Sequence, residues 1–175
     1  MSLAIRDERP ADVAVIAAVT RAAFADHPHS SHTEEFIVAA LRRAGVLTIS
    51  LVAEIRDDDV GQCLQIVGHI GFSPVTIADG SPNWFGLGPV AVTPSYQRRG
   101  IGRELIEVGL ARLRSLGAAG CVLLGEPEYY VRFGFACEPA LTLADVPPEY
   151  FLALAFDSRR TAGEVRYHEA FQAVS

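Results

Sequence analysis

Residues 90–105 of this 175-residue chain have the sequence VAVTPSYQRRGIGREL, and this stretch decides the fold. The β-branched residues at its start predict a strand, Gly100 and Gly102 predict a tight turn, and the residues beyond predict a helix that follows directly. The first N–H groups of a helix lack intrahelical partners, and the helix dipole adds about half a positive charge there. Glycines at this point allow a diphosphate to approach the backbone. The stretch therefore predicts an anion site, flanked by cationic side chains at Arg98, Arg99 and Arg103.

The two glycines also fit a simpler interpretation, in which they only make a tight connection between a strand and a helix. The dinucleotide fingerprint G-x-G-x-x-G is not matched, because Glu104 and Leu105 stand where the third glycine belongs. The P-loop is not matched either, because the chain contains no lysine. The spacing alone thus leaves open a plain turn or an anion site outside these two motifs.

Toward the amino terminus, the pattern predicts two helices. The first opens at Pro10, since proline suits a first helical position. The second begins with a capping box formed by Ser31 and Glu34, and it ends at Gly45. Apolar residues recur at helical spacing in the first helix and mark its buried stripe, which consists of Val13, Ile16, Val19 and Ala23.

The strands flanking residues 90–105 predict a mixed sheet. Residues 47–55 and 64–72 alternate in polarity and predict an antiparallel hairpin, with a turn at 57–61. His69 falls on the polar parity of its strand, so we expect it to be structural or surface-exposed. Pro89 cannot donate a ladder hydrogen bond, which predicts a bulge or a sheet edge. The expected order is βααβββαβαββ, with strands at 3–5, 47–55, 64–72, 85–93, 121–124, 152–156 and 165–170, and helices from 10, from 31, over 102–116 and over 129–133.

Composition restricts the class of protein. Half of the residues are apolar and 21% are charged, which excludes a disordered segment, a collagen-like repeat and a coiled coil. The net charge of -6 argues against nucleic-acid and anionic-membrane partners. No apolar run approaches the ~20 residues that span a bilayer, and the charged N-terminus does not resemble a signal peptide. Three widely spaced cysteines fit a reduced compartment, so we expect one domain, residues 1–175, in the cytoplasm.

Two segments resemble the GNAT superfamily of N-acetyltransferases. Residues 97–102, QRRGIG, are similar to the acetyl-CoA loop [QR]-x-x-G-x-[GA] of this family and follow PVAVTP. Residues 129–135, YYVRFGF, are similar to its Y-x-x-x-G-F segment after the fifth strand. The element order also matches from about residue 4 to residue 171. Within the family, residues 86–92 and 124–130 resemble a bacterial subgroup of acetyltransferases that are known mainly from their sequences.

The resemblance implies a fold and a cofactor. The fold is α/β (α+β), with a mixed, mostly antiparallel central sheet of about seven strands, splayed between strands 4 and 5 and flanked by about four helices. Acetyl-CoA is the implied co-substrate, with its diphosphate on the backbone of residues 97–103 and its pantetheine arm along residues 90–92. The implied cofactor-binding residues are Val90, Ala91, Val92, Gln97, Arg98, Arg99, Gly100, Ile101, Gly102, Arg103, Tyr130 and Phe133.

The resemblance also implies catalytic roles. The N–H of Val92 would polarise the acetyl carbonyl, since a preorganised donor of this kind contributes ~3 kcal/mol. Tyr130 aligns with the tyrosine that protonates the departing thiolate, and Tyr129 is the alternative, because the phase of the helix decides which ring points inward. The other interpretation of Tyr130 is that it only packs.

The general base is left open by the sequence. Residues 86–92 contain no carboxylate, so Glu126 and Glu54 are candidates through a bridging water, and a low-pKa acceptor would need no dedicated base. The loop histidines His27, His29 and His32 lack partners at metal-ligand spacing, so we expect no metal there. They could instead tune the binding of the acceptor.

These observations predict an N-acyltransferase that moves an acetyl group from acetyl-CoA to a primary amine of an unidentified small molecule or peptide. The alternative is a CoA-binding sensor or partner-binding module that keeps the fold with little turnover, and a nucleotide-binding protein is a third hypothesis. Sheet edges near the C-terminus could pair across a homodimer.

Overall fold

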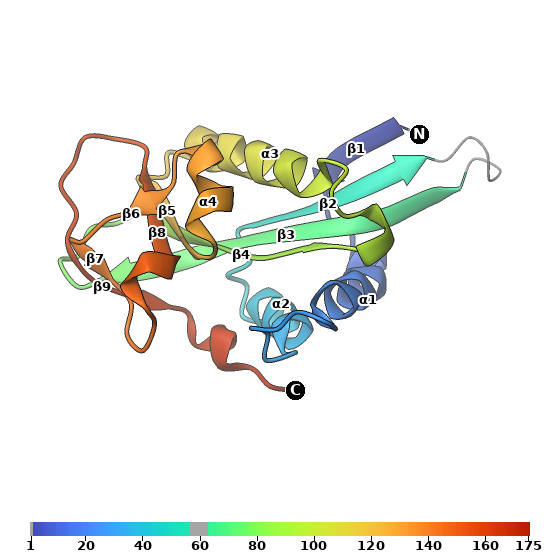
Figure 1. Cartoon of the computed structure of the whole chain (residues 1–175), viewed down its shortest axis with the longest axis horizontal. Coiled ribbons are helices and arrows are strands. Elements are labelled where there is room, and N and C mark those ends of the chain that lie inside the picture. Colours follow the sequence, from blue (N-terminus) through green and yellow to red (C-terminus); the bar gives the residue numbers. More distant parts are fainter. Residues whose placement is uncertain (1, 57–62) are drawn as a thin grey trace.

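The computed structural model describes residues 2–56 and 63–175, so the turn expected at 57–61 lies outside the described residues. Four helices and nine strands are present in this part of the chain (Figure 1). The helices are α1 (Val13–Phe24), α2 (Glu34–Arg43), α3 (Ile101–Ser115) and α4 (Pro127–Tyr130). The strands are β1 (Ser2–Asp7), β2 (Ile49–Arg56), β3 (Leu64–Ile77), β4 (Trp84–Val92), β5 (Gly120–Leu124), β6 (Ala136–Cys137), β7 (Leu141–Thr142), β8 (Phe151–Ala155) and β9 (Gly163–Tyr167).

The strands form a mostly antiparallel sheet in the order β1-β2-β3-β4-β5-β8-β6. The exception within this order is the parallel pair of β4 and β5, which is hydrogen-bonded only between residues 84–86 and 120–122. Beyond Gly86 the two strands separate, so the expected splay between strands 4 and 5 is confirmed. β9 pairs with the far end of β3, and β7 pairs with β9. The prediction of about seven strands missed β6 and β7, because two residues carry too little pattern to mark a strand.

Two helices cover each face of the sheet. Figure 1 shows α3 and α4 on one face and α1 and α2 on the other. The larger core lies under α3, where Leu105, Ile106 and Leu113 pack against the sheet residues Ile70 and Phe72. Gly109 of α3 lies so close to the Phe72 ring that an added Cβ would collide with it. Burial of each such side chain stabilises the fold by about 1.5–3 kcal/mol.

β4 is irregular at the expected proline. Opposite β3, Val90 faces Ile70 while Leu87 faces Phe72, so β4 contains an extra residue at Gly88–Pro89. The bulge expected from Pro89 is thus confirmed. It bends β4 at the point where the strand leaves β5.

The first two helices differ from the predictions in detail. Val13 is 37% exposed, and Thr20 replaces it on the buried stripe, because Val13 lies in the first turn where the sheet does not cover it. The capping box does not form. The Ser31 hydroxyl bonds Thr33, and Glu34 accepts from Ser30, so the helix follows Thr33 instead.

His69 is fully buried, so the surface-exposed alternative is wrong. Polarity alternation predicts exposure only where one face of a sheet is open to water, and β3 is covered on both faces. Gly45 ends α2 with φ +69°, as expected. In the described part of the chain, no helix combines the length and apolarity needed to cross a bilayer.

Candidate functional site

The start of α3 forms a corner of unpaired N–H groups. Arg98 and Gly100 both have positive φ, at +60° and +85°, so the turn presents successive N–H groups on one side. The first intrahelical bond runs from Glu104 N to Gly100 O, at 3.0 Å. The N–H groups of residues 101–103 therefore have no helical acceptor, and the helix dipole adds positive potential there.

The edge of β4 beside this corner is open. Thr93 N donates to Val67 O on β3, at 2.8 Å. Because N–H directions alternate along an antiparallel strand, Ala91 also faces β3, whereas the N–H groups of Val90 and Val92 face the opposite edge. On that edge β5 is paired only as far as Gly86 on β4. Among residues 2–56 and 63–175 the Val90 and Val92 amides thus have no strand partner and are available to a ligand, whereas the Ala91 amide faces β3.

Gln97 supports the same edge from the turn. Its Nε2 donates to the carbonyl oxygen of Val92, at 3.0 Å. A strand residue points its N–H and C=O to the same side, so Gln97 satisfies the Val92 acceptor and leaves the Val92 donor free.

The arginines of the loop are arranged differently from one another. Arg103 is paired with Glu107 on the next turn of α3, at 2.8 Å, so it is not a free cation. The Arg99 guanidinium lies over the Tyr96 ring, 5.2 Å from its centroid. Arg98 forms no ion pair with residues 2–56 or 63–175.

Tyr129 and Tyr130 lie on α4 beside this corner and have different surroundings. Tyr130 is buried in the core under α3, and its ring lies where a Cβ on Gly125 would be. Burial raises the pKa of Tyr130 to about 12. Burial also raises the pKa of Tyr129, although Arg132 opposes the shift. Both phenols therefore remain protonated at neutral pH and can serve as donors. Phe133 packs against both tyrosine rings.

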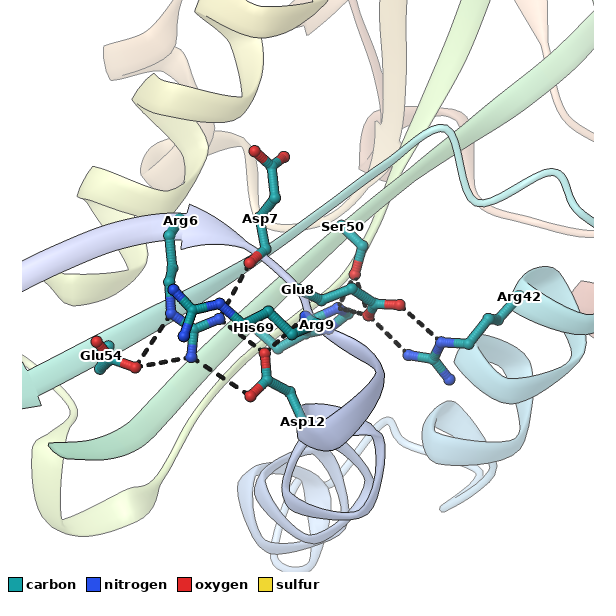
Figure 2. Close-up of polar contacts among 9 residues, drawn as sticks. All are labelled: Arg6, Asp7, Glu8, Arg9, Asp12, Arg42, Ser50, Glu54 and His69. Carbon is teal, nitrogen blue, oxygen red and sulfur yellow. Dashed lines mark hydrogen bonds and ion pairs between the residues drawn. The ribbon is translucent and has the colours of Figure 1, made fainter.

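The two candidate bases are separated from each other. Glu54 of β2 accepts two hydrogen bonds from Arg6, at 2.7 and 3.0 Å, and Arg6 also binds Asp12 (Figure 2). Glu54 is therefore committed to an ion-pair cluster at the start of α1. Glu126 is exposed at the residue before α4, and its carbonyl accepts from the N–H groups of Tyr129 and Tyr130.

A buried polar cluster around His69 was not found from the sequence. Figure 2 shows Glu8, Arg42, Ser50 and His69 linked in a chain. Ser50 Oγ donates to Glu8, at 2.5 Å, because a carboxylate can only accept. Ser50 Oγ must then accept from His69 Nε2, at 2.8 Å, which leaves His69 Nδ1 as an unprotonated acceptor. That Nδ1 has no partner among the described residues. No spacing rule connects four residues in four separate segments, namely the residue after β1, α2, β2 and β3.

The charges of this cluster depend on burial. Burial lowers the pKa of His69 to about 4, which Glu8 opposes and Arg42 reinforces. Burial pushes the pKa of Glu8 upward, but the hydrogen bonds from Arg42 and Ser50 outweigh it, so the net shift is downward. The imidazole is therefore neutral at pH 7, and the carboxylate is charged.

The loop histidines lie near a small cavity between α1 and α2. The His27 and His29 rings are in edge contact, with centroids 6.2 Å apart, and both residues are exposed. His32 lines the cavity of about 240 Å³, together with Thr20, Arg21, Phe24, Ala25, Glu34 and Glu35. Within the described ranges no group of three or more His, Cys, Asp or Glu residues could hold a metal ion.

An open strand edge that leads into the N-terminus of a helix suits one class of ligand, an extended molecule that can lie along the strand with an anionic group at the helix. The model of the Acetyltransferase (GNAT) family matches residues 14–135 of this chain. The chain belongs to this family.

Individual relatives agree with this assignment. The chain is 40% identical to the uncharacterized N-acetyltransferase YhbS of Escherichia coli K12 over 131 residues, which cover 75% of this chain and 72% of the relative. A GNAT family acetyltransferase from Brucella melitensis, crystallised in complex with acetyl-CoA, is 48% identical over 97% of this chain and 98% of its own, with a TM-score of 0.82. E. coli YhbS, crystallised in complex with CoA, is 34% identical over 99% of this chain and 93% of its own, with a TM-score of 0.84.

Proposed function

We propose that the protein transfers an acetyl group from acetyl-CoA to a primary amine of a small molecule or peptide. The observation that carries the proposal is the free edge of β4 at Val90 and Val92, which runs into the N–H groups at the start of α3. The complexes of the Brucella protein with acetyl-CoA and of YhbS with CoA support this choice of co-substrate.

The residues present fit such a ligand. The pantetheine arm is extended and carries amide groups, so it can pair with the Val90 and Val92 amides as an added strand does. The diphosphate then meets the turn, where Arg98 supplies a cation without an ion-pair partner among the described residues and the first turn of α3 supplies N–H donors. A Cβ on Gly102 would lie 3.6 Å from the Tyr129 hydroxyl oxygen, so larger side chains would fill this corner.

The proposed chemistry uses two groups of the chain. The amine nitrogen attacks the thioester carbon, and the Val92 N–H stabilises the oxygen that becomes negative. The C–S bond then breaks, the Tyr130 hydroxyl donates its proton to the departing thiolate, and the resulting phenolate takes a proton back from solvent water. A phenol that stays protonated at neutral pH suits this step, and acid catalysis of this kind contributes about 10²–10⁴-fold. The proton lost by the amine goes to solvent water, directly or by way of Glu126.

A specific observation favours a second candidate function. Residues 84–92 of β4 carry no carboxylate, and Glu54 is held by Arg6. A CoA-binding sensor with little turnover would need no general base, so it fits these two facts.

Two measurements test the proposal. Isothermal titration with CoA should give saturable binding, and release of free thiol from acetyl-CoA should increase with at least one member of a panel of primary amines. Binding without thiol release would instead support the sensor. Absence of binding at high micromolar CoA would remove the co-substrate from both candidates.

A further inference from the structure

The Tyr129 hydroxyl lies in the corner between α3 and β4. The position of a Cβ on Gly102 is 3.6 Å from the Tyr129 hydroxyl oxygen and 3.8 Å from Val92 Cγ2. Three elements thus meet at this point: α4 through the Tyr129 hydroxyl, α3 through its first turn, and β4 through its last residue, Val92. The Tyr129 hydroxyl therefore lies beside the first turn of α3, whose N–H groups have no helical acceptor.

Its ring is held firmly on three sides. The ring packs edge-to-face against Tyr130, with centroids 4.9 Å apart, and against Phe133, at 5.7 Å. The Arg132 guanidinium lies over the ring, 4.7 Å from the centroid. The negative face of the ring attracts a cation stacked in this way. The side chain is consequently oriented before any ligand arrives.

The hydroxyl itself is available. Within residues 2–56 and 63–175 the Tyr129 hydroxyl has no hydrogen-bond partner. It is also not among the unpartnered side-chain atoms that are fully buried, so a ligand can reach it. Tyr96 provides a contrast: it also carries an arginine over its ring, but its hydroxyl bonds Gln65 on β3. A fixed ring with a free hydroxyl indicates a donor reserved for a ligand.

Resting on the proposed function, we propose that Tyr129 positions the carrier by donating a hydrogen bond from its hydroxyl to the diphosphate, opposite the N–H groups of α3. Tyr129 and Tyr130 then have separate roles: Tyr129 holds the anionic end of acetyl-CoA, and Tyr130 serves the thioester. The Arg132 guanidinium acts through Tyr129 by fixing the ring, and it adds positive charge to the same side of the corner.

Calorimetric titration of the full chain tests this division. Tyr129→Phe keeps the ring and its packing but removes the donor. Loss of a hydrogen bond to a charged group should weaken CoA binding about tenfold. Adenosine 3′-phosphate 5′-diphosphate carries the diphosphate without pantetheine, so its affinity should fall by the same factor. The thermal midpoint should not change, because the hydroxyl bonds no other part of the described chain. Tyr150→Phe, an exposed tyrosine outside the site, is the matched control and should bind both ligands as the unmodified protein does.

The alternatives give different results. Unchanged CoA affinity in Tyr129→Phe would overturn the inference while leaving the proposed function intact, provided that the unmodified protein binds CoA. Weaker CoA binding with unchanged affinity for the diphosphate fragment would also overturn it, because the contact would then belong to the pantetheine arm. If the unmodified protein bound neither ligand, the proposed function would fall as well.

Discussion

Acidification should destabilise the protein, and His69 accounts for a definable part of the loss. The imidazole is fully buried on β3, and burial lowers its pKa from 6.5 to about 4. The unfolded chain therefore binds a proton at a higher pH than the folded chain does. As the pH falls from about 6.5 to about 4, this difference removes stability progressively. At 1.36 kcal/mol per pH unit, the full loss is about 3 kcal/mol, a large share of the stability of a typical domain.

Urea unfolding between pH 7 and pH 4 measures this loss. His69→Gln retains a donor toward Ser50 but does not titrate, so the stability difference between the unmodified protein and this variant isolates His69. We expect that difference to change by about 3 kcal/mol over this range, to the disadvantage of the unmodified protein. His29→Gln, at an exposed loop position, controls for the loss of an imidazole as such. A difference between the two proteins that stays constant with pH would show that His69 is not buried in its neutral form.

Three further outcomes are expected. Gly102→Val should raise the KM for acetyl-CoA with little change in the thermal midpoint. Gly102→Ala should be close to the unmodified protein in both measurements, because its Cβ would meet its nearest neighbour at 3.6 Å. A KM in the valine variant equal to that of the unmodified protein would contradict the assignment of the diphosphate to this corner. Tyr130→Phe should lower kcat more than it raises KM, because the lost donor acts in the transition state, and full activity would return Tyr130 to a packing role. Arg6→Ala should lower the free energy of unfolding, measured in urea, by about 3 kcal/mol, because the largely buried carboxylates of Asp12 and Glu54 lose their paired cation. A loss below about 1 kcal/mol would show that solvent replaces the arginine.

The helix and turn at the site were predictable because their signals are local. Gly100 predicted a tight turn, and the structure has a turn there with a positive φ of +85° at this residue. The amphipathic pattern of residues 102–116 predicted α3 to within one residue of its observed bounds at both ends. Pro89 predicted a bulge or a sheet edge in β4, since proline cannot donate to the ladder, and the structure has the bulge.

The features that the sequence did not predict depend on contacts between distant parts of the chain. The burial of His69 follows from helices that cover both faces of β3, which alternation within one strand does not reveal. The commitment of Glu54 to Arg6 joins residues 48 positions apart. The roles of Tyr129 and Tyr130 were left open in sequence, because adjacent residues on a four-residue helix differ only in the direction that tertiary packing gives them.

The most direct test of the account is a crystal structure of this protein in complex with CoA. We predict that the diphosphate oxygens lie within hydrogen-bonding distance of backbone N–H groups in residues 97–103, and that the pantetheine arm pairs with Val90 and Val92 along the open edge of β4. A diphosphate bound away from the start of α3, or an arm that does not follow β4, would contradict the central claim.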